Sequence, residues 1–290
     1  LGAQAMRRFL ESVDHMTVKS AVSTRLEAAE ILAAQKRPVL FERVNDYAEA
    51  RIVGNLCISR GLIAKALGTT SDSLVSAIAE ALEKPRGYEV TPSADFLKNK
   101  EENPNIIDIL PLLTYHRAES RVYTSATVVL ARDPQTGRQN ASFHRMMYLG
   151  RNRFAIRIVP RDLYRFWNIN KMNGLDTPVV VACGLHPAIC LAAATSFPDL
   201  NELTLARAFY PFECCPVNGI DVPVDAEVVM VGRILHDETA DEGPFVDLTG
   251  TWDTVRKEPV VEIDTLYWRD NLIWQAIVPG GTEHRLLMGL

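Results

Sequence analysis

The chain has 290 residues, of which 47% are hydrophobic and 23% are charged. With 16 Gly, 16 Pro and no biased tract, this composition excludes a disordered, collagen-like or coiled-coil chain. The formal net charge of −5 lacks the basic excess of a nucleic-acid-binding protein. The length is typical of about two domains.

No apolar run approaches the ~18 residues of a membrane span, and the N-terminus lacks the residue order of a signal peptide. We therefore expect a cytoplasmic protein that binds neither membrane nor nucleic acid. Met6 has the character of a natural first residue. The five cysteines are odd in number, lie in apolar segments and form no C-x-x-C pair, so buried free thiols are expected.

The first part of the chain alternates between helical and strand patterns. The expected elements are a helix over 24–34, strands over 39–41 and 51–55, and helices over 61–67 and 71–83. Ser71 is the expected N-cap of the last helix. Proline, glycine and a charged patch mark residues 85–111 as a connector. Residues 6–110 are accordingly predicted to form an N-terminal mixed α/β domain.

From Arg121 the pattern changes to β-branched strands separated by turns. Expected strands cover 122–132, 144–149, 154–159, 178–182, 227–235, 260–267 and 273–278, and expected helices cover 162–168, 186–193 and 200–209. A meander of this kind with interleaved helices favours a β-barrel or curled sheet over residues 111–290. The fold class is thus α/β in the broad α+β sense.

Common catalytic signatures are absent from the sequence. It has no G-x-x-x-x-G-K-[ST], no strand followed by G-x-G-x-x-G and no H-E-x-x-H, and its six histidines are scattered singly. These absences count against ATPase, dinucleotide-binding and zinc-protease functions.

An acidic turn follows a strongly apolar strand and contains Glu242 and Asp247. One interpretation is a solvated loop. The alternative is that Gly243-Pro244 turns the chain so that the two carboxylates converge. Crowding would then raise the pKa of one carboxyl and produce a proton donor near neutral pH.

A second cluster places His144 and Arg145 inside an apolar β segment. Arg145 is either an edge-strand charge or a ligand for a carboxylate or phosphate, for which its planar fork is suited.

Two further acids, Asp162 and Glu202, lie at predicted helix starts. They are either helix caps or, together with Asn140, an all-oxygen site for a hard divalent ion such as Mn²⁺ or Mg²⁺.

Several fragments, taken together in order and spacing, resemble the UbiD family of reversible decarboxylases. They are T-Y-H-R-A-E-S-R-V-Y-T-S-A (114–126), N-x-x-x-x-R (140–145), P-V-V-V-A-C-G-L-H-P-A (178–188), E-L-T-L-A (202–206), V-P-V-D-A-E-V-V (222–229) and E-T-A-x-E-G-P-F-x-D-x-T-G (238–250). The likeness is dense over about residues 111–290 and weaker before them. It implies a flavin-reductase-like split β-barrel and a carboxy-lyase that uses prenylated FMN supplied by a flavin prenyltransferase.

The resemblance also implies roles for particular residues. Arg145, Glu242 and Asp247 match the family's catalytic network, and Asn140 and Glu202 match ligands of the Mn²⁺ that holds the cofactor phosphate. Asp162 stands where many members have histidine, and a shift of one residue would put Arg161 there instead. Mg²⁺ is an alternative ion and K⁺ a further candidate. The expected cofactor-binding residues are Asn140, Phe143, His144, Arg145, Arg157, Ile158, Val159 and Arg161.

In the mechanism that the resemblance implies, Arg145 orients the departing carboxylate and Asp247, with a raised pKa, protonates the carbon that lost CO₂. The substrate is an aromatic, heteroaromatic or α,β-unsaturated acid, and His144 favours the heteroaromatic or small unsaturated kinds.

Family chains are longer, with a C-terminal domain absent here, and form homodimers or larger assemblies. The alternatives are a plain FMN-binding reductase and a non-catalytic subunit of a carboxylase.

Overall fold

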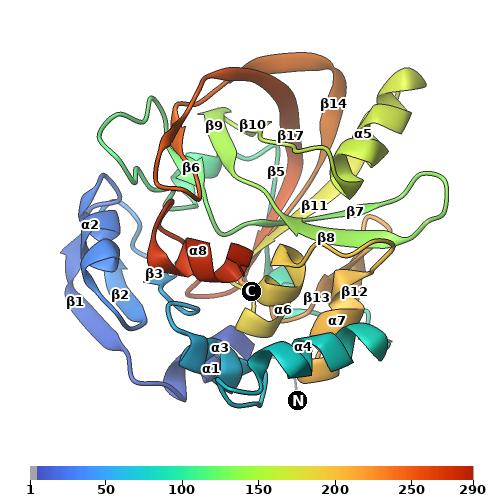
Figure 1. The fold of residues 1–290 in the computed structure, drawn as a ribbon. Coiled ribbons are helices and arrows are strands. Elements are labelled where there is room, and N and C mark those ends of the chain that lie inside the picture. The colour runs from blue at the N-terminus through green and yellow to red at the C-terminus, as the bar shows by residue number, and fades with distance from the viewer. Residues whose placement is uncertain (1–4, 290) are drawn as a thin grey trace.

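The fold is organised around two large β-sheets with helices packed beside them (Figure 1). The computed structural model describes residues 5–289. Its helices are α1 (Ala5–Glu11), α2 (Glu27–Ala34), α3 (Arg60–Ala66), α4 (Leu74–Glu83), α5 (Asp162–Met172), α6 (Pro187–Ala194), α7 (Glu202–Phe209) and α8 (Thr282–Gly289), with 3-10 helices at Asp95–Lys98 and Ile106–Asp108. Within this described range, no helix has the length and apolar character needed to cross a membrane.

The strands divide into four sheets. They are β1 (Met16–Val22), β2 (Val39–Val44), β3 (Arg51–Gly54), β4 (Glu89–Val90), β5 (Asn99–Glu102), β6 (Tyr123–Thr124), β7 (Val128–Arg132), β8 (Gln139–Phe143), β9 (Met146–Gly150), β10 (Arg153–Ile156), β11 (Thr177–Cys183), β12 (Glu213–Val217), β13 (Ile220–Pro223), β14 (Val228–Glu242), β15 (Phe245–Val246), β16 (Trp252–Asp253), β17 (Arg256–Trp268) and β18 (Ile273–Ala276).

One sheet has the strand order β1-β2-β3-β18 and lies at the left of Figure 1. Its strand β18 pairs with β3 in parallel, with Ile273 opposite Arg51. The sheet therefore joins an N-terminal segment to one that follows the long strand β17. This pairing brings α8, which comes directly after β18, in front of the larger sheet (Figure 1).

The larger sheet has nine strands in the order β6-β9-β10-β17-β14-β11-β7-β8, with β5 pairing to β17. Strands β14 and β17 form a long antiparallel pair whose register shifts twice, and they arch over the top of the molecule in Figure 1. At the first shift a Cβ on Gly232 would lie 2.1 Å from the carbonyl oxygen of Glu262, so only glycine fits. The arch carries Glu242, the last residue of β14, to the edge of the sheet.

Helices α6 and α7 pack on strand β8 at the end of the nine-stranded sheet, and α6 also contacts α8. Helix α6 is buried along almost its whole length because its residues are nearly all apolar. It starts at Pro187, where a missing N–H costs nothing, and the Nδ1 of His186 accepts a hydrogen bond from the N–H of Ala188. Helix α7 packs on α6 and begins with Glu202. This packing fixes Glu202 next to β8.

Most expected elements are confirmed. The strands expected over 39–41, 51–55, 154–159, 178–182, 227–235, 260–267 and 273–278, and the helices expected over 24–34, 61–67, 71–83, 162–168, 186–193 and 200–209, all occur with shifted ends. The five cysteines are buried free thiols, as expected. The mixed α/β fold with a curled sheet is confirmed as well.

Other expectations were wrong. The strand expected over 122–132 is split into β6 and β7, because the chain changes partners there: β6 pairs with β9, whereas β7 pairs with β8 and β11. The strand that returns from β7 is β8, so the strand expected over 144–149 is a further one, β9. Ser71 is not a cap, since α4 begins at Leu74. The pattern also missed α1, β1, β12 and β13, and the connector contains the short strands β4 and β5.

Candidate active site

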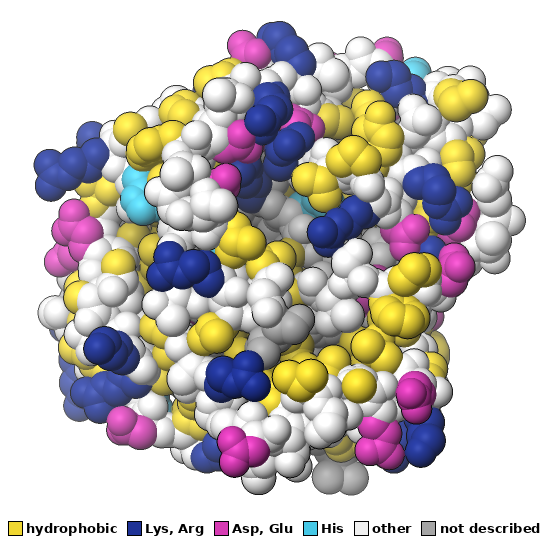
Figure 2. Space-filling model, viewed as in Figure 1, with side chains coloured by type: hydrophobic (Ala, Val, Ile, Leu, Met, Phe, Trp, Pro, Cys, Tyr) yellow, Lys and Arg dark blue, Asp and Glu magenta, His cyan; other side chains and the backbone are white. Residues whose placement is uncertain are grey.

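Two adjoining cavities lie beside α8, the smaller next to β15 and the larger next to the start of α5 and the end of α6. Figure 2 shows the surface hollowed near the middle of this face, with Lys or Arg side chains around the hollow. The smaller, of about 220 Å³, is lined by Ser125, Phe143, His144, Arg145, Arg157, Val159, Phe245, Asp247, Leu248, Ile277, Pro279, His284, Leu287 and Met288. The larger, of about 580 Å³, is lined by residues that include Asn140, Ser142, Arg161, Asp162, Arg165 and Glu202. The two share Phe143, His144, Val159 and Met288.

A buried ion pair lies at the wall of the smaller cavity. Arg145, in the short link between β8 and β9, donates from Nε and Nη2 to the two carboxylate oxygens of Glu242, each at 2.9 Å. The Glu242 side chain is fully buried and that of Arg145 is 14% exposed. The ring of Phe245 lies 4.6 Å from the guanidinium carbon. Arg145 is therefore not an edge-strand charge, and Glu242 is not part of a solvated loop.

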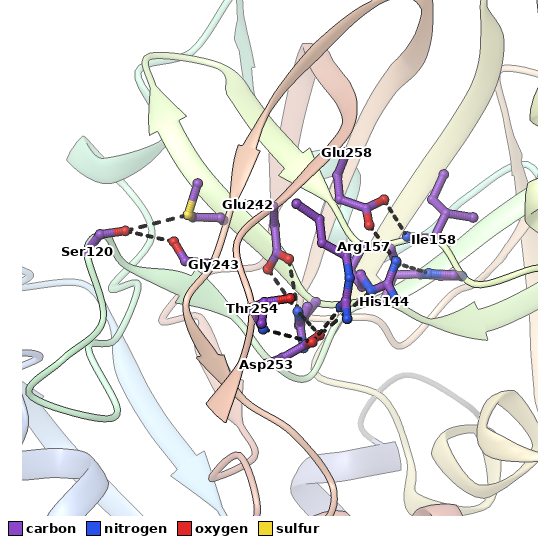
Figure 3. A network of polar contacts seen from close by, with 12 residues as sticks. Ser120, His144, Arg157, Ile158, Glu242, Gly243, Asp253, Thr254 and Glu258 are labelled. Carbon is purple, nitrogen blue, oxygen red and sulfur yellow. Dashed lines mark hydrogen bonds and ion pairs between the residues drawn. The ribbon is translucent and has the colours of Figure 1, made fainter. Parts of the chain in front are cut away.

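Arg145 has a second acidic partner, Asp253, which is the last residue of β16. Its Nη2 also donates to Asp253 Oδ2 at 2.9 Å. Burial alone would lower the pKa of Arg145, but Glu242 and Asp253 raise it, so the guanidinium is charged. Figure 3 shows Glu242 and Asp253 close together, with Arg157 and Glu258 beyond them.

Asp247 lies on the wall of the same cavity but does not hydrogen-bond to Glu242 in the described chain. Its Oδ1 accepts from the N–H of Thr249 at 2.8 Å and from the hydroxyls of Thr249 and Thr251. These donors, chiefly the Thr249 hydroxyl, lower the pKa of Asp247. The expected rise in the Asp247 pKa through crowding with Glu242 was wrong, because the turn gives Asp247 its own donors.

The larger cavity contains a buried carboxylate, Glu202. It accepts from Asn140 Nδ2 at 2.9 Å and from the N–H of Ala141 at 2.7 Å. Burial raises the pKa of Glu202 to about 7. The cap of α7 is Asn201, whose side chain accepts from the N–H of Leu203. Glu202 is consequently not a helix cap, and Asn140 and Glu202 come together as the all-oxygen interpretation requires.

Asp162 opens α5 at the wall of the same cavity. Its Oδ2 accepts from Arg138 Nη2 at 3.0 Å, and the N-cap Arg161 makes no side-chain capping bond. Asp162 is thus an ion-pair partner and not a cap. Across residues 5–289, no group of three or more His, Cys, Asp or Glu side chains is placed to hold a metal ion. The expected set of ligands includes only two such residues, and its third donor is the amide oxygen of Asn140.

His144 lies between the two cavities and is uncharged. Burial lowers its pKa to about 4. Because Nδ1 lies 2.9 Å from the carbonyl oxygen of Arg157, this nitrogen carries the proton. The Nε2 atom then accepts from the Ser142 hydroxyl at 2.9 Å. His144 therefore acts here as a fixed, neutral wall of the cavities.

The segment after β10 completes the wall. Arg157 donates to Glu258 Oε1, and the N–H of Ile158 donates to Glu258 Oε2 at 3.4 Å (Figure 3). Ile158 is buried, whereas Val159 is exposed and lines both cavities. Sequence reasoning missed Asp253 and Glu258. Neither belongs to a local motif, so only the long-range approach of Arg145 and Arg157 identifies them.

Glu283 fixes the helix that closes the smaller cavity. It lies in the first turn of α8, and its oxygens accept from the N–H groups of Asn55 and Cys57 at 3.0 and 2.7 Å. The Glu283 side chain is buried. It ties α8, which carries the lining residues His284, Leu287 and Met288, to the loop after β3.

The buried carboxyl of Glu283 predicts that the stability of the protein depends on pH. Burial raises the pKa of Glu283 to about 7, above the ~4.3 of an unfolded chain. The folded state then binds the proton more tightly, so the free energy of unfolding falls as pH rises from about 4.3 to 7. Glu283→Gln should flatten this slope by up to about 1.4 kcal/mol per pH unit. Urea midpoints at pH 5 and 7.5 measure how stability changes with pH. If wild type and Glu283→Gln show the same change, Glu283 is not its cause.

Comparisons with known proteins identify the family of the chain. The family model for the 3-octaprenyl-4-hydroxybenzoate carboxy-lyase Rift-related domain matches residues 89–282, and the model for the N-terminal domain of that carboxy-lyase matches residues 10–82. These matches define the class of the protein as a carboxy-lyase. The chain belongs to the UbiD family.

The chain is similar to several named decarboxylases. It is 37% identical to the anhydromevalonate phosphate decarboxylase of Methanothermobacter thermautotrophicus, covering 98% of this chain and 68% of that protein. It is 31% identical to the phenolic acid decarboxylase of Bacillus subtilis, covering 91% of this chain and 59% of that protein. The chain thus spans about two thirds or less of the length of these relatives.

A solved structure shows the same fold. An evolved dimeric form of the UbiD-class enzyme HmfF from Pelotomaculum thermopropionicum, in complex with prFMN, superposes with a TM-score of 0.96 at 29% identity, over 99% of this chain and 70% of that one. The resemblance noted in the sequence is therefore confirmed.

Proposed function

We propose that this chain forms the catalytic core of a decarboxylase that removes CO₂ from an aromatic, heteroaromatic or α,β-unsaturated acid with the help of prenylated FMN. The observation that supports this most directly is the buried Arg145–Glu242 pair at the wall of an apolar cavity that also exposes Asp247. Decarboxylases among the relatives and the prFMN complex of HmfF support the same reaction class.

The two cavities fit a flavin with a phosphate-bearing tail. Phe143, His144 and Val159 line both, so an apolar ring could lie in the passage between them. Arg161 and Arg165 line the larger cavity and would attract a phosphate. We propose that the ring system lies against Arg145, Arg157 and Ile158, with the phosphate toward Asn140.

The oxygen donors of the larger cavity fit a hard divalent cation. The Glu202 carboxylate is buried and has only amide donors as hydrogen-bond partners within the described chain. A nearby cation would compensate this charge. We propose that Asn140, Glu202 and Asp162 would hold Mn²⁺ or Mg²⁺ between the protein and the cofactor phosphate, with K⁺ as a further candidate.

When bound, prenylated FMN would supply the acceptor for the electrons that CO₂ leaves behind. Arg145 would bind and orient the substrate carboxylate, and Glu242 fixes Arg145 from behind. Asp247 is ionised in the unloaded protein because Thr249 and Thr251 lower its pKa, so it would first take up a proton from solvent and then deliver it to the carbon that lost CO₂. Phe245, Ile277 and Leu287 exclude water from one side of the cavity and suit the apolar, unsaturated part of an acid.

The remaining parts of the proposal concern the cellular setting. A flavin prenyltransferase would supply the cofactor, and the protein would act in the cytoplasm as a homodimer or larger assembly. These points stay predictions.

The proposed function is tested by purifying the protein anaerobically from cells that also express a flavin prenyltransferase. We expect the absorption spectrum and native mass to show prenylated FMN with one Mn²⁺ per chain, and we expect CO₂ release from at least one unsaturated acid. Glu202→Gln should lose Mn²⁺ and most of the flavin, because an amide is a weaker ligand than a carboxylate. The control Glu80→Gln, on the exposed face of α4, should retain both.

Two outcomes would contradict this function. Unmodified FMN with oxidation of a nicotinamide donor would favour the plain reductase. A protein that binds no flavin in any form would favour the non-catalytic subunit.

A further inference from the structure

Asp253 occupies a position that none of the catalytic roles above uses. Its Oδ2 accepts from Arg145 Nη2 at 2.9 Å and lies 4.0 Å from Arg157 Nε, while its Oδ1 accepts from Arg256 Nη1 at 2.5 Å. The Asp253 side chain is only 15% exposed. One carboxylate thus lies among three guanidinium groups, two of which line the smaller cavity. Figure 3 shows Asp253 below Glu242 and Arg157.

Two of the three guanidinium nitrogens of Arg145 donate to acidic side chains. Glu242 takes Nε and one N–H of Nη2, and Asp253 takes the other N–H of Nη2. Nη1 has no hydrogen-bond partner within residues 5–289, and Arg145 lines the cavity. A guanidinium held at two of its three nitrogens cannot rotate, so the third nitrogen faces a fixed direction.

The backbone explains how Asp253 is brought to this place. β15 and β16 form a two-stranded sheet in which Phe245 is directly opposite Asp253. The same hairpin therefore supplies the ring that covers the face of Arg145 and the carboxylate that binds its edge. Arg256, which pairs with Glu242 across β14 and β17, holds Asp253 from the other side.

We propose that Asp253 is a positioning residue: together with Glu242 it occupies the Nε and Nη2 donors of Arg145, so that Nη1 is the group presented to the substrate carboxylate. This role rests on the proposed function, because it assumes a carboxylate in the cavity. The placement of Arg145 by Asp253 is a property of the protein alone and is measurable without any cofactor.

The first experiment is a double-mutant cycle on the unloaded protein. Asp253→Asn keeps the shape and one acceptor but removes the charge. We expect Asp253→Asn to lower the urea midpoint clearly in the wild type. In an Arg145→Met background the decrease should be less than half as large, because Arg145, the main partner of Asp253, is then missing. The matched control is Asp241→Asn. Asp241 directly precedes Glu242 and forms an exposed pair with Lys257, so its replacement should change the midpoint equally in both backgrounds. An equal effect of Asp253→Asn in both backgrounds would overturn the proposal.

The second experiment measures kcat and KM on protein loaded with prenylated FMN. Asp253→Ala should lower kcat/KM at least tenfold with unchanged flavin content, because a small misplacement of an orienting group is costly. Asp253→Asn should recover part of this loss, since its amide oxygen can still accept from Nη2. Unchanged kcat and KM in Asp253→Ala would also overturn the proposal, since Arg145 would then be oriented by other groups.

The two experiments separate this inference from the proposed function. If loaded wild-type protein releases no CO₂ from any acid, the proposed function fails. The cycle on the unloaded protein still decides whether Asp253 holds Arg145.

Discussion

Replacing Arg145 by Met is expected to destabilise the protein by about 3–5 kcal/mol, because it leaves the Glu242 carboxylate buried without its charge partner. Glu242→Leu should also destabilise the protein but by less, because Asp253 still pairs with the Arg145 guanidinium. The midpoint of urea unfolding at pH 7 measures both. The control Lys257→Met breaks an exposed pair with Asp241 and should change stability by less than about 1 kcal/mol.

The double variant Arg145→Met/Glu242→Leu should be more stable than the sum of the single losses predicts. Two apolar side chains of similar size leave neither member of the pair buried without the other, and such replacements are often close to neutral. Strict additivity of the two single effects would show that the pair does not interact as the geometry indicates. The same double variant should release no CO₂, which would separate the stability of the fold from the function of the pair.

Local patterns predicted the elements whose burial is uniform along the strand. The run Val179-Val-Val-Ala lies in the interior of the nine-stranded sheet and is buried on both faces, so its apolar sequence and its position agree. The segment 122–132 misled the prediction because its strand-like composition continues through the point where the chain leaves β6, paired with β9, and enters β7, paired with β8 and β11. The hydroxyls of Thr124 and Thr127 bond to each other at this point.

The part of the site that the sequence predicted consists of residues from separate fragments of the family pattern that contact one another in the fold. Arg145 and Glu242 are 97 positions apart, and Asn140 and Glu202 are 62 apart, yet each pair forms a hydrogen-bonded contact. Sequence could not decide whether Glu242 is solvated, because its burial depends on the arch of β14 and β17. Asp253 was missed for the same reason. Its importance comes from a distant arginine and not from its neighbours in the chain.

Asp247 has a lowered pKa where the sequence predicted a raised one. If it is the proton donor, Asp247→Asn should lower the rate of decarboxylation by about 10²–10⁴-fold. The amide cannot deliver a proton, while the partly exposed position means that folding, flavin content and Mn²⁺ content should stay unchanged. Turnover at saturating acid, normalised to bound flavin, measures the effect. Asp237→Asn, on the exposed side of β14, is the control.

The hydrogen bonds to Asp247 make a second measurement possible. The Thr249 hydroxyl is the main cause of the lowered Asp247 pKa, so Thr249→Val should raise that pKa. A proton donor with a higher pKa keeps its proton to higher pH, so the pH at which kcat/KM declines should move upward. Thr254→Val, next to Asp253 and without a hydroxyl bond to Asp247, is the matched control. A profile that stays in place in Thr249→Val, or full activity in Asp247→Asn, would assign proton delivery to another group.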